Sequence, residues 1–412
     1  MDSNPNKSRR SFLKASALAG TACIMGPPVL AGLPRTSVIV VGAGAFGGWS
    51  ALQLLRKGAK VTLLDAWGPG NSRASSGGET RVIRTTYGPE RLYTQMAVRA
   101  LQLWRENEQR WNLKLFFRTG VLWMAGTTDD SYERAAMPLM KEAGVRFEKL
   151  SSADCSKRWP QINFDDVSWS IHEPDSGYLA ARRGCEAVLN AFLKEGGEYR
   201  QTKAIPRPVA NNRMQGITVT SGEILNADSY VFACGPWLGK VFPFLAPMII
   251  PTRQEVFFFG TAAGDLSFTE EQLPVWIDNG KRLFYGIPGN HWRGFKIADD
   301  TRGPVIDPTS MERQISTEGL AAARMYLRLR FPALADAPLV ESRVCQYENS
   351  TDQNFVLDRL PEAENVWVVG GGSGHGFKHG PVLGEMVGDA VLGLKGPPKE
   401  LGLSRLLKSS SS

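Results

Sequence analysis

The 412-residue chain is long enough for one large domain or two interleaved ones with a substantial core. Its 42% hydrophobic and 22% charged residues are typical of a globular protein and exclude a disordered or fibrous one. The net charge of +7 comes from basic residues scattered along the chain, not from a stripe interleaved with aromatic residues, so we expect no nucleic-acid partner. The 4 histidines and 5 cysteines show no metal-ligand spacing, so we expect no metal site.

Residues 1–31 have the pattern of an export signal. Arg9 and Arg10 are followed by Phe12, Leu13, Lys14, a weakly apolar stretch and small residues near position 31. This pattern predicts a twin-arginine signal peptide, and therefore delivery by the twin-arginine export machinery to the periplasm or another extracytoplasmic compartment. A disordered basic tail is the alternative. Because the twin-arginine route carries folded proteins, the segment also predicts a cofactor that binds before export.

A nucleotide-binding unit follows the signal. The β-branched run at 37–41 predicts a buried strand. Next come Gly42, Gly44 and Gly47 in GxGxxG spacing, an amphipathic helix, and a second strand ending at Asp65. This order predicts a Rossmann-type turn, whose glycines allow a tight turn, close approach of a pyrophosphate and helix–strand packing, while the acid binds a ribose diol. A glycine-rich turn without a nucleotide is the alternative.

The middle of the chain predicts a second domain. Strands are indicated at 121–125, 255–260 and 282–286, and a helix at 182–194. We therefore expect an α/β fold (α+β overall) in which a Rossmann-like nucleotide-binding domain is interleaved with a mainly antiparallel-sheet substrate domain. The predicted segments are 36–118, 176–250 and 345–395 for the nucleotide-binding domain, 119–175 and 251–344 for the substrate domain, and 396–412 for a tail that ends in disorder.

A second glycine-rich turn lies near the C-terminus. A strand at 366–369 runs into the glycine-rich segment 370–378, and Pro381 opens a helix. This element brings another positive helix end to the site. A reduced flavin carries negative charge around N1 and O2, which such a helix end would stabilise, whereas a nicotinamide has no such need. The two turns together favour FAD over NAD.

The chain resembles the monomeric sarcosine oxidase and N-methyltryptophan oxidase family, within the glycine oxidase and D-amino-acid oxidase group of flavoproteins. The resemblance extends from about residue 38 to 394. Its most specific pieces are the first glycine turn, Thr80-Arg81-Val82-Ile83-Arg84, Gly-Phe-Lys at 294–296, Cys345-Gln346-Tyr347 and Ser373-Gly374-His375-Gly376-Phe377-Lys378.

The resemblance implies how the cofactor is held. Cys345 would join the flavin 8α-methyl through sulfur and make the FAD covalent, whereas a lone cysteine read without the resemblance is usually an inert core residue. Arg81 would lie against the flavin. His375 would hydrogen-bond the flavin ring, or else be satisfied by the backbone of a tight turn. The predicted cofactor-binding residues are Gly42, Gly44, Gly47, Asp65, Arg81, Cys345, Gly374, His375, Gly376 and Lys378.

The resemblance also implies catalytic roles. Arg84 and Lys378 would hold a substrate carboxylate, the first with a planar fork and the second with a point charge, although an arginine more often lies on a solvated face. Lys296 would promote the reaction with oxygen, because a fixed cation stabilises superoxide. Tyr285 and Tyr347 would line the substrate pocket, although core packing is the default role of a tyrosine. The predicted catalytic residues are Lys296, Arg84, Lys378, Arg81, Tyr285 and Tyr347.

Three positions depart from the family pattern. Gly77 stands where members often carry histidine, Asp300 where sarcosine oxidase has an active-site histidine, and Gly372 where phenylalanine is usual. Gly372 would open space near the flavin ring. Asp300 would put a carboxylate at the pocket and favour a cationic substrate, or it would simply be solvated. These changes leave the substrate open.

We therefore expect a monomeric FAD-dependent oxidase of a secondary amine or N-methyl amino acid. A hydride equivalent passes from the carbon beside nitrogen to flavin N5, the imine hydrolyses, and O2 reoxidises the flavin to give hydrogen peroxide. One alternative is an exported flavin dehydrogenase that passes electrons to a quinone or another carrier. Another is a relative that binds a ligand without catalysis, and an NAD-dependent dehydrogenase fits least.

Overall fold

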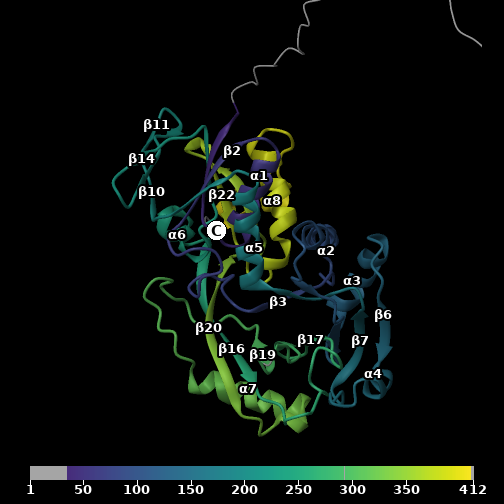
Figure 1. The fold of residues 1–412 in the computed structure, drawn as a ribbon. Helices are drawn as coiled ribbons and strands as arrows, with labels where there is room; N and C mark the ends of the chain where they lie inside the picture. Colours follow the sequence, from purple (N-terminus) through teal and green to yellow (C-terminus); the bar gives the residue numbers. More distant parts are fainter. Residues whose placement is uncertain (1–34, 292, 410–412) are drawn as a thin grey trace, which may run out of the picture. The chain divides into compact units, whose positions relative to one another are not determined.

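The computed structural model describes residues 35–291 and 293–409, so the predicted export signal at 1–31 lies outside the described residues. From Thr36 onward the chain forms one compact unit, which is built on two large sheets (Figure 1). No helix among the described residues is both long and apolar enough to cross a bilayer.

The first large sheet has 6 strands, of which β21 alone is antiparallel to its neighbour. In spatial order they are β21 (Val356–Leu360), β22 (Ala363–Gly370), β15 (Ser229–Phe232), β1 (Ser37–Val41), β2 (Lys60–Asp65) and β9 (Glu198–Gln201). Alternate residues of β1 enter different cores, with Val38 and Val40 on one face and Ile39 and Val41 on the other. Burial on both faces explains the unbroken apolar run of this strand.

Helices cover one face of this sheet. Helix α1 (Ala45–Arg56) packs between α5 (Ala181–Lys194) and α8 (Gly380–Val391), and the three lie side by side in Figure 1. Helix α2 (Arg91–Trp111) packs against α8 and completes the layer. Both α1 and α8 begin at the carboxyl ends of parallel strands, so their N-termini point toward the same edge of the sheet.

The second large sheet has 8 strands and is antiparallel except for the pair β17 and β5. In spatial order they are β20 (Leu339–Ser350), β16 (Ile249–Phe259), β19 (Phe295–Asp299), β18 (Leu283–Ile287), β17 (Val275–Asn279), β5 (Val121–Gly126), β7 (Val167–Glu173) and β6 (Glu148–Ser151). Helix α7 (Thr317–Arg330) packs on one face, where it shares a core with Phe295 and Ile297 of β19. Strand alternation therefore turns Lys296 of β19 to the other face.

Smaller elements complete the fold. A three-stranded sheet is made of β3 (Thr80–Ile83), β8 (Gly177–Ala180) and β4 (Phe116–Phe117), a second of β10 (Ala204–Pro206), β13 (Ile217–Val219) and β14 (Ile224–Leu225), and β11 (Val209–Ala210) pairs with β12 (Arg213–Met214). The remaining helices are α3 (Ser131–Glu142), α4 (Ser152–Arg158), α6 (Leu238–Val241) and α9 (Ser404–Ser409), with 3-10 turns η1 (Gly235–Trp237), η2 (Pro243–Leu245), η3 (Pro332–Leu334), η4 (Phe377–His379) and η5 (Lys399–Leu401). The predicted α/β class, with a parallel nucleotide-type sheet and a mainly antiparallel second sheet, is confirmed.

Two predicted boundaries do not coincide with the elements of the structure. The boundary at 345 falls inside β20, because this strand pairs with β16 along its whole length, from Ile249 opposite Ser350 to Phe259 opposite Leu339. The segment 396–412 was assigned to a tail, and within it Leu401 and Leu403 are buried in the cores that flank the first sheet. Apolar side chains that can reach a core do not stay in solvent.

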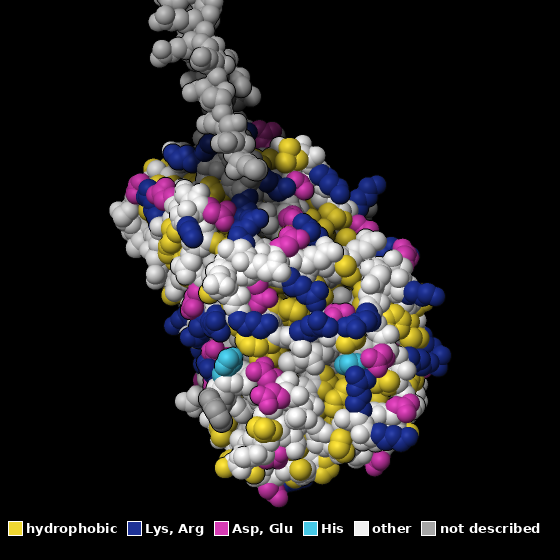
Figure 2. Space-filling view, turned by 45° about the vertical axis from the view of Figure 1, so that its right-hand side comes forward, with side chains coloured by type: hydrophobic (Ala, Val, Ile, Leu, Met, Phe, Trp, Pro, Cys, Tyr) yellow, Lys and Arg dark blue, Asp and Glu magenta, His cyan; other side chains and the backbone are white. Residues whose placement is uncertain are grey.

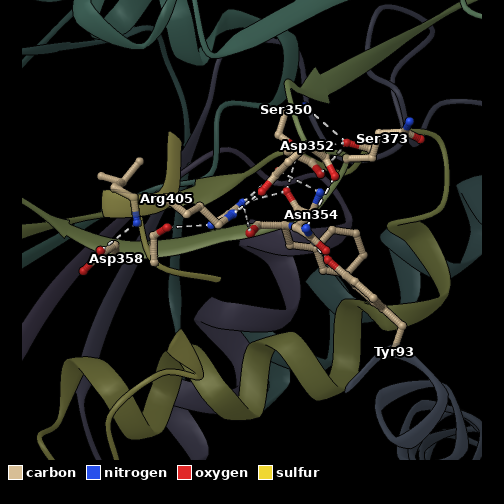
Figure 3. Close-up of polar contacts among 12 residues, drawn as sticks. Tyr93, Ser350, Asp352, Asn354, Asp358, Ser373 and Arg405 are labelled. Carbon is tan, nitrogen blue, oxygen red and sulfur yellow. Dashed lines mark hydrogen bonds and ion pairs between the residues drawn. The ribbon is translucent and has the colours of Figure 1, made fainter. Parts of the chain in front are cut away.

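Arg405 of α9 ties this C-terminal segment to a loop that leads to the second glycine turn (Figure 3). Its Nε lies 2.6 Å from an Asp352 carboxylate oxygen, and its Nη2 donates to the carbonyls of Asn354 at 3.0 Å and Phe355 at 2.8 Å. The same loop accepts from Ser350, whose backbone N–H donates to Ser373 Oγ at 3.2 Å. The C-terminal helix therefore braces the turn that carries the second group of predicted site residues.

The face in Figure 2 carries Lys and Arg side chains with Asp and Glu interspersed, and its hydrophobic side chains lie in small groups. Exposed ion pairs of this kind, such as Arg146 with Asp175 at 3.0 Å, contribute at most about 1 kcal/mol. The free energy of folding depends mainly on the buried cores around the two sheets.

Replacing Arg405 by alanine removes its hydrogen bonds to the partly buried carbonyls of Gly402, Asn354 and Phe355 and its ion pair with Asp352. We expect this to lower the free energy of unfolding by about 1–3 kcal/mol. Arg328→Ala is the matched control, because the Arg328 side chain is 60% exposed and its one ion pair among the described residues, with Asp336, is 3.9 Å long. The Arg328→Ala control should lower the free energy of unfolding by less than about 0.5 kcal/mol. Urea unfolding of both variants checks this, and equal costs would show that Arg405 does not brace the loop.

Candidate active site

One cavity of about 840 Å³ runs from the first sheet to the second. Its walls include both glycine turns of the first sheet and side chains from β5, β17, β18 and β20 of the second. The predicted residues on its surface are Gly42, Gly44, Asp65, Arg81, Arg84, Tyr285, Tyr347, Gly374, His375, Gly376 and Lys378. Segments more than 300 positions apart in the sequence thus share one site.

The first glycine turn has the geometry that its sequence predicts. Gly42 has φ +106°, and a Cβ there would lie 2.3 Å from the Ala233 carbonyl oxygen. A Cβ on Gly47 would lie 1.8 Å from the Gly42 carbonyl oxygen, so α1 can pack against the turn only without a side chain there. At Gly44 a Cβ would meet only Ser76 Oγ at 3.2 Å, so this glycine leaves the backbone open to the cavity.

Asp65 lies on the cavity wall at the end of β2, as predicted, and its carboxylate also organises the turn. One oxygen accepts from the Ala43 backbone N–H at 2.7 Å, and the other accepts from Trp67 and Gly68 at 2.8 Å and 2.7 Å. A ribose diol would share these oxygens with the backbone. The role of Asp65 in ribose binding stays a prediction.

The second glycine turn closes the cavity from the other side of α1. Gly374 has φ +81°, and a Cβ there would lie 2.6 Å from the Tyr347 ring, while a Cβ on Gly376 would lie 2.7 Å from the Phe46 ring. Both ring nitrogens of His375 have protein partners, since Nε2 lies 3.2 Å from the Gln353 carbonyl and Nδ1 3.4 Å from Tyr87 Oη. Both nitrogens thus have partners outside the turn, and a hydrogen bond from His375 to the flavin ring stays a prediction.

Arg84 lies between two aromatic rings at the second-sheet end of the cavity. Its guanidinium carbon is 4.4 Å from the Tyr87 ring centre and 4.6 Å from that of Trp123, and Nη1 donates to the Thr86 carbonyl. Stacked rings hold an arginine without neutralising it. The alternative of a solvated Arg84 is wrong, because β3 delivers this side chain into the cavity wall.

A buried carboxylate fixes the backbone that carries Arg84. Glu173 of β7 is 1% exposed and accepts from the backbone N–H and hydroxyl of both Thr85 and Thr86. Sequence reasoning missed this residue, as it missed Tyr87 and Trp123. Thr85 and Glu173 are 88 positions apart in the sequence, so no local sequence pattern predicts their hydrogen bond.

Lys378 lies beside Arg84. Its ammonium donates to Tyr87 Oη at 2.8 Å and to the His375 carbonyl at 2.8 Å, and the residue is 4% exposed. Burial and the charge of Arg84 lower the pKa of Lys378 well below its usual value. A negatively charged ligand at this point would restore the charged form.

Arg81, Cys345 and Lys296 surround a smaller cavity of about 50 Å³ that adjoins the first one through Arg81, Tyr285 and Tyr347. Lys296 Nζ donates to the Thr80 carbonyl at 3.1 Å, and Cys345 Sγ lies 3.9 Å from an Arg81 nitrogen. Burial and the nearby Arg81 lower the pKa of Lys296 to about 7. The predicted residues therefore form one region, although Lys296 and Cys345 do not line the main cavity.

Asp300 is a cavity residue rather than a solvated one. Its carboxylate accepts from Tyr347 Oη at 2.9 Å and pairs with Arg302 at 3.1 Å. Burial raises the pKa of Asp300, and Arg302 opposes the rise. Arg302 thus offsets part of the negative charge of Asp300, and this carboxylate faces Arg84 and Lys378 across the substrate end of the cavity.

The other two departures from the family pattern have steric causes. A Cβ on Gly77 would lie 1.9 Å from the Asn71 carbonyl oxygen, so this turn excludes any side chain, histidine included. A Cβ on Gly372 would lie 3.2 Å from a carboxyl oxygen of Glu348. The space that Gly372 leaves is therefore bordered by an acid.

Basic side chains that do not pair with a carboxylate distinguish this region. The hydrogen bonds of Arg84, Lys296 and Lys378 go to neutral oxygen atoms, and none of the three pairs with a carboxylate of the described residues. Buried charges need a partner, so the site fits an anionic occupant. FAD fits, because the open backbone at Gly44 and the N-terminus of α1 suit its pyrophosphate.

These features define a dinucleotide-binding oxidoreductase with two glycine turns and a cationic active site. The family model described as FAD dependent oxidoreductase matches residues 37–390, and the chain belongs to this family.

The relatives agree with that assignment. The chain is 31% identical to monomeric sarcosine oxidase of Bacillus sp. (strain B-0618), over 86% of this chain and 92% of the relative. It is 30% identical to N-methyl-L-tryptophan oxidase of Salmonella newport (strain SL254), over 91% of this chain and 100% of that protein. L-proline dehydrogenase from P. horikoshii has a similar fold, with a TM-score of 0.76, 20% identity and coverage of 89% and 95%. The resemblance inferred from the sequence is confirmed.

Proposed function

We propose that this FAD-dependent oxidoreductase oxidises the C–N bond of a secondary amine or N-methyl amino acid and passes the electrons to O2. The observation that carries the proposal is the pair of cations, Arg84 and Lys378, which lacks a carboxylate partner at the end of a cavity that begins at the dinucleotide turn. The names of the two relatives point to N-methyl amino acids, whose carboxylate would supply the missing negative charge.

When bound, FAD supplies the redox chemistry by accepting a hydride equivalent from the carbon beside nitrogen. Gly42, Gly44 and Asp65 would hold its dinucleotide end, and Arg81 and the backbone of Gly374 and Gly376 its ring end. The imine that leaves the site hydrolyses in water to an amine and a carbonyl compound.

The chain positions the substrate by charge. The guanidinium of Arg84 and the ammonium of Lys378 bind the carboxylate, while the rings of Tyr87 and Trp123 keep Arg84 in place. Asp300 faces these cations, and burial raises its pKa, so it accepts the proton of the substrate ammonium more readily than a solvated aspartate. A deprotonated nitrogen is what hydride removal from the neighbouring carbon requires.

Lys296 supports O2 as the electron acceptor. It is 3% exposed, it lies against Arg81 and Tyr285, and none of its hydrogen bonds goes to a charged group. A fixed cation next to the reacting atoms stabilises the superoxide anion that forms when O2 takes the first electron. The amine is charged below about pH 7 and gains charge at higher pH when an anion forms beside it.

The deciding measurement is hydrogen peroxide yield under air with N-methyl amino acids and with the matching amines that lack the carboxylate. We expect one peroxide per substrate oxidised, and Arg84→Met should lower kcat/KM for the amino acids by about ten- to a hundredfold while changing that for the amines far less. Lys57→Met, which removes an ion pair with Asp389 on the outer side of α1, is the control and should change neither.

Lys296→Met separates an oxidase from a dehydrogenase. In an oxidase it should slow the reaction with O2 by at least about tenfold and leave reduction of an artificial acceptor nearly unchanged. Little peroxide from the parent protein, together with rapid reduction of a quinone, would instead establish the dehydrogenase. Failure of every tested amine to bleach the flavin without air would contradict both activities.

We further propose that Cys345 binds the flavin covalently. Its Sγ lines the smaller cavity beside Arg81, one of whose guanidinium nitrogens lies 3.9 Å away. Acid precipitation of the purified protein should give a yellow pellet, and Cys345→Ser should release the colour to the supernatant. A colourless pellet from the parent protein would exclude the linkage and leave FAD binding intact.

We also propose export by the twin-arginine route and a monomeric active form. The support for export is the Arg9-Arg10 signal pattern, and the name of one relative, monomeric sarcosine oxidase, supports the monomer. Replacing Arg9 and Arg10 by lysine should retain the protein in the cytoplasm, as fractionation of cells would detect. Unchanged delivery of that variant would contradict the assignment.

A further inference from the structure

Glu348 is a buried acid that the proposed reaction does not use. It follows Tyr347 in β20, so strand alternation points it away from the substrate end and toward the first sheet. The residue is 7% exposed and borders the main cavity. Its Oε1 accepts from the Gly372 backbone N–H at 3.3 Å, whereas its Oε2 is buried without any hydrogen-bond partner.

Glycines surround the unpartnered oxygen. An ideal Cβ on Gly370 would lie 3.5 Å from Oε2, and one on Gly235 would lie 3.7 Å from it. Gly370 ends β22 and Gly235 follows β15, at the edge where open α/β sheets bind their ligands. Because Glu348 lines the main cavity, its free oxygen lies next to the cofactor end of that cavity, and the described residues supply no side chain that hydrogen-bonds it.

No cation of the described residues pairs with this carboxyl. Titratable groups on the elements around it include Asp65 at the end of β2, Cys234 after β15, His375 after β22, Tyr347 on β20 itself, Arg253 on β16 and Lys240 on α6. Burial raises the pKa of Cys234 and of Tyr347 and lowers that of His375, so these three are uncharged at neutral pH. Arg253 pairs with Glu255 at 2.6 Å, and Lys240 pairs with Asp307.

Burial raises the pKa of Glu348 to about 8, opposed by the Gly372 hydrogen bond. At neutral pH the acid is therefore mainly protonated, since an unpaired buried carboxylate is strongly disfavoured. Because Oε1 accepts from Gly372, the proton is left for Oε2. A neutral carboxyl with a free O–H needs an acceptor, and the described residues offer none to this atom.

We propose that Glu348 binds the cofactor as a neutral acid, donating a hydrogen bond from Oε2 to an acceptor atom of FAD. The acceptor is a ribityl hydroxyl or a carbonyl or nitrogen of the flavin ring, all of which are uncharged. Loss of the proton would replace this hydrogen bond by repulsion between an anion and the acceptor. Cofactor retention should therefore weaken as the pH rises through the titration of Glu348.

The position of Gly372 fits this role. A Cβ there would lie 3.2 Å from Oε1, so the glycine lets the acid approach its backbone N–H. A larger residue at 372 would displace the carboxyl from the hydrogen bond that orients it. The pair of Glu348 and Gly372 thus acts as one positioning unit.

The test compares three full chains loaded with FAD, all carrying Cys345→Ser so that dissociation is measurable: the parent, Glu348→Gln and Glu348→Met. The dissociation constant of FAD is measured by flavin fluorescence between about pH 6 and about pH 10. The parent should lose up to about tenfold in affinity for each pH unit above the titration point, at or above about 8. Glu348→Gln keeps an N–H donor without a titrating proton and should bind equally well at every pH.

Glu348→Met should bind FAD about tenfold more weakly than the parent at pH 7, because the ring or ribityl acceptor loses its partner. A shifted flavin absorption spectrum in this variant would assign the acceptor to the ring, and an unshifted one to the ribityl chain. Thermal unfolding of the three chains without FAD shows whether Glu348→Met has a folding defect. If it has, the pH profiles of the parent and of Glu348→Gln test the proposal without it.

Equal affinity of parent and Glu348→Met at pH 7 would overturn the proposal, as would a parent whose affinity is constant or rises up to pH 10. The inference requires FAD binding but not amine oxidation. If the amine assays fail but FAD affinity falls with pH as expected, only the proposed function is contradicted. If the protein is an active oxidase but its FAD affinity does not change with pH, only the role of Glu348 is contradicted.

Discussion

The site depends on buried positive charge that the protein does not neutralise. Arg84, Lys296 and Lys378 direct their donors to carbonyl and hydroxyl oxygens, and taking a charge out of water without a counter-ion costs several kcal/mol. The fold offsets part of this cost with aromatic rings and backbone dipoles. What remains is available to any anion that enters, so the same unpaired basic groups would let a flavin and the proposed carboxylate substrate bind next to each other.

The strands hold the basic side chains in place although no carboxylate pairs with them. Alternation along β19 and β20 turns Lys296, Cys345 and Tyr347 to the cavity face while Phe295 and Ile297 anchor the opposite face to α7. Glu173 fixes the backbone just after Arg84 through four hydrogen bonds. The cations are therefore held apart by secondary structure, since their mutual repulsion would otherwise scatter them.

Local sequence patterns predicted much of the fold and of the cavity wall. The spacing of Gly42, Gly44 and Gly47 reports a backbone geometry that only glycine satisfies, and period and capping residues located the helices that start at both turns. The partners of Arg84 could not be found in this way, because Glu173 and Trp123 reach it through strand pairing between distant segments. The boundary at 345 falls inside β20 for the same reason. Where β20 ends depends on the length of its partner β16, which lies about ninety positions earlier.

The order in which the walls of the cavity occur along the chain has a consequence for biosynthesis. The first turn ends at Gly47, but the segment that closes the opposite wall spans Gly372 to Lys378. A ribosome-bound intermediate therefore lacks one wall of the binding surface until residue 378 has left the exit tunnel. FAD cannot act as an early folding template for the N-terminal region, because its capture has to wait for the second glycine turn.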